Sequence, residues 1–225
     1  MNLLALETSA DRGSVAVQCG DEIVSIDLEV PREQSARLIP AVDSLLRRVG
    51  IGLGALDAIA FGRGPGSFVG VRLAASVTQG LAMASDLGVV AVSSLAALAQ
   101  QIERRERILH SLVCIDARMG EVYWGEYRVS DGVAADSGRE ALSRPAEVGL
   151  PAGAGWAAAG DGFARFAEPL ADHCQRAAIV RAAWVPAAVD LLPTARRALE
   201  RGEAVAPERL TPTYLREQTA WKRQD

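Results

Sequence analysis

Residues 62–70 read Gly62-Arg63-Gly64-Pro65-Gly66-Ser67-Phe68-Val69-Gly70, between an apolar strand-like segment at 56–61 and a helical pattern at 67–84. A glycine-rich turn from a strand into a helix can expose backbone N–H groups at the positive end of the helix dipole, where anions bind. Glycines also allow positive φ angles and close helix-to-sheet contact, and Ser67 can cap the helix. Neither a Walker GK[ST] nor a GxGxxG pattern is present, so residue chemistry favours a structural turn.

The segments on both sides of this turn alternate between strand and helix patterns. Upstream, residues 2–9 indicate a buried strand, 14–19 with 23–28 a hairpin, and 34–49 an amphipathic helix. Downstream, 89–92 indicate a strand and 93–101 a helix. Strand-helix-strand order implies parallel pairing through helical crossovers, so the sequence predicts an α/β protein.

A charged run, Glu103-Arg104-Arg105-Glu106-Arg107, interrupts the pattern. It predicts a boundary between two lobes, 1–104 and 105–225, and leaves open whether the C-terminal tail returns to the first lobe. Its alternative interpretation is a solvated helix end. Beyond it we expect strands at 108–115 and 121–129, joined by a turn, and a helix at about 186–201.

Composition restricts the class of protein. The chain has 225 residues, of which 49% are apolar, enough for a substantial core, and its formal charge of −4 argues against unaided binding of nucleic acid. Three scattered cysteines predict buried thiols rather than disulfides or a CxxC metal site. No apolar stretch reaches about 18 residues, and the first residues lack a basic region, so we expect a cytoplasmic protein without membrane association.

The run from Gly62 to Arg72 resembles the GxGPGSFTGxR signature of the TsaB family, also called YeaZ, with Val69 where the family usually has Thr. Further matches are Leu3–Ser9, Ser14–Val17, Gln34–Pro40 and Pro212–Arg216, the last similar to a C-terminal PxYLR. The resemblance is specific in 1–101 and in the tail, and weak from 130 to 205. It implies the actin- and hexokinase-like (ASKHA) fold: two related lobes, each a five-stranded mixed sheet flanked by helices.

The resemblance also implies a subunit without catalytic residues, metal or cofactor. The catalytic relative, TsaD, carries two metal-binding histidines four residues apart, on one helical face. The corresponding positions here are Ser94 and Leu98. Neither His110 nor His173 has a second histidine or cysteine at metal-site spacing. The sequence leaves open whether Asp116 and Asp161 approach one another in space.

The implied function is to dock on a TsaD-type catalytic subunit, and on a TsaE-type ATPase when assembled. TsaD would then transfer the threonylcarbamoyl group to the tRNA adenosine beside the anticodon, so that tRNA contact is indirect. One alternative is an ATP-dependent small-molecule kinase of the same superfamily, in which Glu7 would organise metal and phosphate rather than cap or pack. A protease is a third alternative, but two histidines offer no recognisable triad.

Two helices, 34–49 and 67–84, have more apolar positions than one buried face needs. The resemblance implies that TsaB and TsaD join through such helices as a pseudo-symmetric bundle, and without a partner the same patch would favour a homodimer. Alternatively, the chain itself covers both faces. The predicted interface comprises Ser35, Leu38, Ile39, Val42, Val71, Arg72, Ala75, Thr78 and Ala82, and the predicted structural turn comprises Gly62, Gly64, Pro65, Gly66 and Ser67.

Overall fold

The computed structural model describes residues 1–28, 33–136, 138 and 140–216. The chain divides into two compact units: Met1–Ala97 with Pro186–Pro212, and Leu98–Val185 with the residues from Thr213 onward. The division falls inside helix α3 (Ser94–Glu106), which continues through most of the charged run. That run therefore lies at the end of a helix, as its alternative interpretation proposed.

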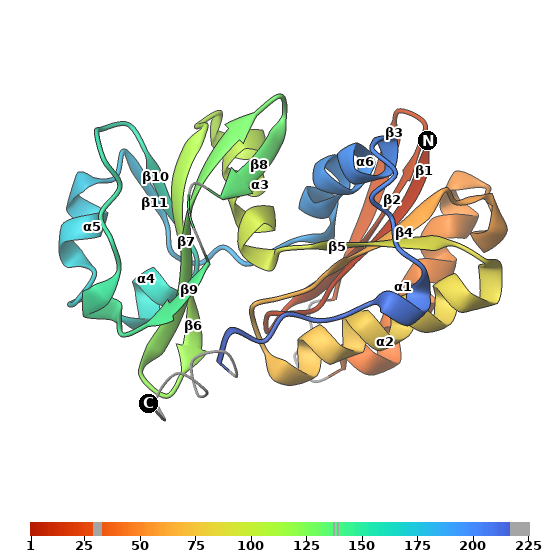
Figure 1. Cartoon of the computed structure of the whole chain (residues 1–225), viewed down its shortest axis with the longest axis horizontal. Helices are drawn as coiled ribbons and strands as arrows, with labels where there is room; N and C mark the ends of the chain where they lie inside the picture. Colours follow the sequence, from red (N-terminus) through yellow and green to blue (C-terminus); the bar gives the residue numbers. More distant parts are fainter. Residues whose placement is uncertain (29–32, 137, 139, 217–225) are drawn as a thin grey trace. The chain divides into compact units, whose positions relative to one another are not determined.

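The first unit is built on a five-stranded mixed sheet in the order β3-β2-β1-β4-β5. Strand β1 pairs antiparallel with β2 and parallel with β4. Helices α1 and α2 cover one face of this sheet, while the short helix η3 and helix α6 cover the other (Figure 1). The strands are β1 (Asn2–Glu7), β2 (Gly13–Cys19), β3 (Glu22–Leu28), β4 (Ala58–Gly62) and β5 (Gly88–Val92), and the helices are α1 (Gln34–Val49), α2 (Phe68–Ser85), η3 (Ala188–Leu191) and α6 (Leu192–Glu200).

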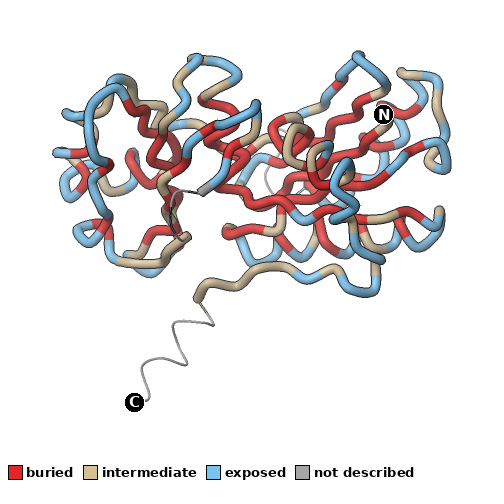
Figure 2. The backbone as a smooth tube through the Cα atoms, turned by 45° about the horizontal axis from the view of Figure 1, so that its top comes forward, coloured by how far each residue is buried: buried red, intermediate tan, exposed pale blue. Residues whose placement is uncertain are grey.

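Strand β1 supplies both faces of the core. Leu4 and Leu6 pack among residues of α1 and α2, whereas Leu3 and Ala5 pack against α6. These four side chains are fully buried, because successive residues of a strand point to opposite faces and helices cover both. Full burial of one leucine side chain is worth about 1.5–3 kcal/mol. Buried residues follow the strands in both units, and exposed residues lie on outer helix faces and turns (Figure 2).

The second unit contains a mixed sheet in the order β11-β10-β6-β7-β8, with β9 paired to β7. Its core includes Leu112, Cys114, Trp156 and Phe163. The elements are β6 (His110–Arg118), β7 (Glu121–Ser130), β8 (Val133–Asp136), β9 (Ala141–Ser143), β10 (Ala157–Ala159), β11 (Ile179–Arg181), α4 (Gly162–Arg165) and α5 (Ala171–Arg176).

The two sheets share one topology. In each, three consecutive antiparallel strands are followed by two strands that add in parallel beside the first, in the orders β3-β2-β1-β4-β5 and β8-β7-β6-β10-β11. This confirms the predicted α/β class with a mixed sheet in each of two units. The second sheet differs from the expected five strands by the additional strand β9.

The cysteines differ in part from the sequence-based expectation. All three cysteines are free, but only Cys114 is buried, while Cys19 and Cys174 are partly exposed, so the prediction of buried thiols was wrong for those two.

Within the described residues, no helix combines the length and apolar character needed to span a membrane.

Candidate functional site

The glycine-rich turn after β4 uses its own N–H groups to hold neighbouring segments. Arg63 N donates to the Val92 carbonyl at 2.8 Å, and Ser67 N donates to the Ser9 carbonyl at 2.7 Å. Ser67 Oγ caps α2 by accepting a hydrogen bond from Gly70 N at 3.4 Å. N–H groups occupied in this way are withdrawn from an anion, which supports the structural interpretation of this turn.

Close approach to β1, more than backbone conformation, explains the glycines. A Cβ on Gly62 would lie 2.1 Å from Glu7 Oε2, one on Gly66 would lie 2.5 Å from the Ser9 carbonyl oxygen, and one on Gly70 would lie 1.8 Å from the Thr8 carbonyl oxygen. Within the 62–70 turn, only Gly64 has a positive φ, 87°, and the peptide to Pro65 is cis. The turn thus packs directly on the end of β1.

Glu7, at that end of β1, is fully buried. Its Oε1 accepts a hydrogen bond from Ser9 N at 2.6 Å, and its Oε2 accepts one from Ser94 Oγ at 2.8 Å. Burial raises the pKa of this carboxyl, and the hydrogen bonds from Ser9 and Ser94 oppose that rise. The geometry supports a packing carboxylate that connects β1 to the start of α3.

Replacing Glu7 by Gln is expected to raise stability increasingly with pH. The amide keeps both contacts, because its oxygen can accept from Ser9 N and its NH2 can donate to Ser94 Oγ. A raised pKa in the folded state means that the glutamic acid's contribution is complete below the unfolded pKa and is lost as pH rises toward the folded pKa. Urea unfolding of both proteins between about pH 5 and pH 8 should therefore show a gap that widens in favour of the variant. A gap independent of pH would contradict the raised pKa.

The predicted interface residues separate into two groups by burial. Six are buried within the first unit, at 6% exposure or less: Leu38, Val42, Val71, Ala75, Thr78 and Ala82. Ser35, Ile39 and Arg72 are exposed. The buried six therefore cannot offer side chains to a partner, which corrects the choice of face. Leu73, Val77 and Leu81, on the second apolar stripe of α2, are partly buried against the same core. The chain itself therefore covers most of both apolar stripes, as the alternative interpretation proposed, and a third face of α2 points outward.

The outward stripe of α2 has a composition that the isolated chain does not explain. Its exposed residues are Phe68, Val69, Arg72, Ser76, Gly80, Met83 and Ala84. Exposure reaches 54% at Phe68, 74% at Val69 and 57% at Met83, and Arg72 stacks on the Phe68 ring. A Cβ on Gly80 would meet nothing within 4 Å. Glycine inside a helix costs about 1 kcal/mol relative to alanine, so some other requirement favours it there.

The histidines have structural contacts. His110 Nε2 lies 2.7 Å from Glu126 Oε1, and buried His173 has its Nε2 3.1 Å from the Val148 carbonyl oxygen. At the two positions that correspond to the histidines of TsaD, Ser94 donates a hydrogen bond to Glu7, and Leu98 is buried. Across 1–28, 33–136, 138 and 140–216, no group of three or more His, Cys, Asp or Glu residues is placed to hold a metal.

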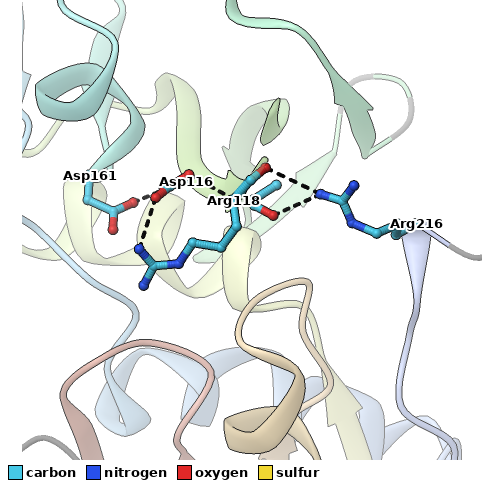
Figure 3. Close-up of polar contacts among 5 residues, drawn as sticks. Asp116, Arg118, Asp161 and Arg216 are labelled. Atoms are coloured by element: carbon cyan, nitrogen blue, oxygen red, sulfur yellow. Dashed lines mark hydrogen bonds and ion pairs between the residues drawn. The ribbon is translucent and has the colours of Figure 1, made fainter. Parts of the chain in front are cut away.

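In the second unit, Asp116 and Asp161 do come together: Asp161 Oδ1 accepts a hydrogen bond from Asp116 N at 2.9 Å (Figure 3). The Asp116 carboxylate in turn accepts two hydrogen bonds from Arg118, one from its backbone N–H at 2.8 Å and one from its guanidinium at 3.2 Å. Arg216 contacts the same hairpin. Sequence reasoning missed this contact, and its only signal was the PxYLR-like ending.

Comparisons with known proteins point to tRNA threonylcarbamoyladenosine biosynthesis, through a family model described as TsaD and through relatives named TsaB. A family model described as TsaD, tRNA N6-adenosine threonylcarbamoyltransferase, matches residues 28–220. The chain is 37% identical over 235 residues to the tRNA threonylcarbamoyladenosine biosynthesis protein TsaB of Escherichia coli (strain K12), covering 99% of this chain and 98% of that protein. It is 33% identical over 240 residues to TsaB of Haemophilus influenzae, covering 99% and 97%.

Two solved structures show the same fold along almost the whole chain. YeaZ from Pseudomonas aeruginosa superposes with a TM-score of 0.89 at 43% identity, covering 95% of this chain and 99% of that one. A Pseudomonas aeruginosa protein described as uncharacterized, with similarity to peptidase YEAZ, gives the same TM-score and identity, with 96% and 99% covered.

Proposed function

Since the chain belongs to the TsaB family of tRNA threonylcarbamoyladenosine biosynthesis proteins, we propose that it is the non-catalytic, pairing subunit of a tRNA threonylcarbamoyltransferase complex. A TsaD-type subunit would carry out the transfer to the tRNA adenosine next to the anticodon. The observation that carries the proposal is the outward stripe of α2, with its exposed apolar side chains and an internal glycine that no neighbour in the described chain requires.

The stripe suits a helix of a partner. Ser76, Gly80 and Ala84 recur every four residues, so they share one face and let a second backbone approach closely. Phe68, Val69 and Met83 supply apolar area at the two ends of the stripe, and Ile39 of α1 is 54% exposed on the same side of the sheet. Exposed apolar side chains on one face, bordered by polar ones, are typical of protein–protein interfaces. Ser35, Ile39 and Arg72 remain in the proposed interface.

The kinase alternative finds less support in the geometry. Glu7 is fully buried beneath Gly62, so it could not coordinate a metal in solvent without rearrangement. In the hairpin after Ile115, the carbonyls of Ala117 and Arg118 accept hydrogen bonds from Arg216. A phosphate loop needs donors at such a position, and this turn offers acceptors already engaged.

The comparison with a protein described as similar to a peptidase does not favour hydrolysis here. Catalytic triads require a histidine hydrogen-bonded to the nucleophile. His110 contacts Glu126, and His173 is buried with its Nε2 near a backbone carbonyl. The protease alternative therefore has no histidine in a suitable place among the described residues.

The proposed complex has further components. A TsaE-type ATPase would join the pair, and tRNA would contact the complex mainly through TsaD. The tRNA would be modified in the cytoplasm. Because an isologous interface uses one surface twice, the chain alone should form a homodimer through the same stripe.

The test is a tRNA modification assay with one component omitted at a time. The purified chain alone should produce no threonylcarbamoyladenosine and hold no stoichiometric iron or zinc, whereas its addition to a TsaD-type subunit from the same cells, with the ATPase, should restore product. Mass spectrometry of digested tRNA measures the product, and elemental analysis measures the metal. Product from the chain alone, or about one tightly held metal per chain, would overturn the proposal.

A further inference from the structure

The β6–β7 hairpin ends in an unusual turn. Arg118, Met119 and Gly120 all have left-handed backbones, with φ of 63°, 57° and 77°, and only the last is a glycine. The pairing register shifts between Asp116 and Arg118, and Met119 at the tip is 84% exposed. Non-glycine residues in this conformation cost free energy and persist only where surrounding contacts impose them.

Two sets of contacts impose this turn. From within the sheet, Asp116 accepts hydrogen bonds from Arg118 N and from the Arg118 guanidinium. From the C-terminal tail, Arg216 Nη2 donates to the Ala117 carbonyl at 2.8 Å and to the Arg118 carbonyl at 3.4 Å (Figure 3). Arg216 Nη1 donates to Glu121 Oε2 at 2.5 Å. One planar guanidinium thus holds residues on both sides of the turn through a rigid fork of donors, a geometry that a lysine ammonium does not offer.

We propose that Arg216 is a conformational clamp. Its guanidinium holds the segment Thr213–Arg216 on the β6–β7 hairpin and fixes the left-handed turn 118–120, so that tail docking and hairpin shape form one coupled equilibrium. This clamp consists of the Arg216 guanidinium, the Glu121 carboxylate and the carbonyls of Ala117 and Arg118. This device lies outside the outward stripe of α2, and it does not depend on the proposed function.

Partial exposure makes the clamp releasable. The side chain of Arg216 is 36% exposed and that of Glu121 is 20% exposed, so solvent can replace these contacts without opening the core. A segment at the surface can open locally at a fraction of the free energy of global unfolding. Anything that binds only the released tail, or only the reshaped hairpin, would shift the equilibrium by its differential affinity.

Trypsin offers a direct probe, because cleavage after Arg216 requires that guanidinium to enter the protease's acidic specificity pocket. Arg216 cannot be bound there and to Glu121 together. In Glu121→Gln the charged acceptor is lost while the trypsin site remains, so cleavage after Arg216 should accelerate about tenfold relative to cleavage after exposed Arg209. Glu168→Gln, which makes the same charge change at an exposed position of the same unit, should leave this ratio unchanged.

A second variant tests the coupling. Arg216→Lys keeps the charge but loses the fork, and amide exchange at residues 118–120 should then accelerate several-fold, while exchange in the centre of β6 stays as in the parent. An unchanged cleavage ratio in Glu121→Gln would show that the clamp does not hold the tail. Unchanged exchange at 118–120 in Arg216→Lys would show that turn and tail are independent. Either result overturns the proposal, and both are measured on the full chain without a partner.

Discussion

A chain carrying both Ser76→Glu and Gly80→Lys is expected to lose pairing with the proposed TsaD-type partner, and with it tRNA modification, while remaining folded. Both positions are exposed on the outward stripe of α2, and bulky charged side chains there would prevent close approach of a partner helix. We expect the affinity to fall at least about a hundredfold, or about 2.7 kcal/mol. Titration calorimetry with the purified TsaD-type subunit measures this, and the proposed homodimer should be lost in the same way.

The design separates pairing from folding. Replacing an exposed helical glycine gains up to about 1 kcal/mol in helix propensity, and Glu with Lys four residues later adds about 0.3–0.5 kcal/mol. The matched control, Arg196→Glu with Glu200→Lys, places the same pair on α6, on the opposite face of the sheet. It should pair like the parent. If the stripe variant binds with parental affinity, the interface lies elsewhere.

Gly70→Ala is expected to destabilise the first unit more than alanine at any other glycine of that unit. The added Cβ would lie 1.8 Å from the Thr8 carbonyl oxygen, and Thr8 Oγ1 already donates to the Gly70 carbonyl at 2.6 Å. Neither group is the flexible end of a side chain, so the start of α2 must move away from β1. We expect a loss of about 3–5 kcal/mol, or failure to fold.

Gly80→Ala provides the control within the same helix. Its Cβ meets open space, so the same substitution should stabilise the isolated chain by up to about 1 kcal/mol. Urea unfolding of the two variants should therefore move in opposite directions from the parent. Equal effects would mean that helix propensity alone decides both, and that the contact with Thr8 is not rigid.

Local patterns in the sequence predicted much of this fold. Helix 34–49 has the predicted bounds, because its apolar spacing defines the buried face and the following Gly50 ends the helix. The strands around the glycine turn agree within a few residues. By contrast, the charged run at 103–107 suggested a boundary, whereas α3 continues to Glu106, because charged residues are also good helix formers on a solvated face.

The candidate site was predicted less completely. Ser35, Ile39 and Arg72 are exposed as an interface requires, but six of the nine predicted residues are buried. The predicted set lacks the outward residues Phe68, Val69, Gly80 and Met83. Phe68, Val69 and Met83 lie at the two ends of the helix, outside both apolar stripes, and a glycine such as Gly80 carries no hydrophobic signal. Gly80 was the available clue, as a glycine inside a helical pattern without a turn to explain it.

The sequence by itself determined the family, the α/β class and the glycine-rich turn, because these depend on residues close together in the chain. Only the tertiary structure decided which face of α2 points outward, and that Glu7 binds Ser94 and Arg216 binds Glu121. Periodicity shows which residues share a face, but a face is buried or exposed according to what the rest of the chain places against it. Contacts between residues far apart in sequence leave no periodic signal, so they follow only from the folded arrangement of the strands.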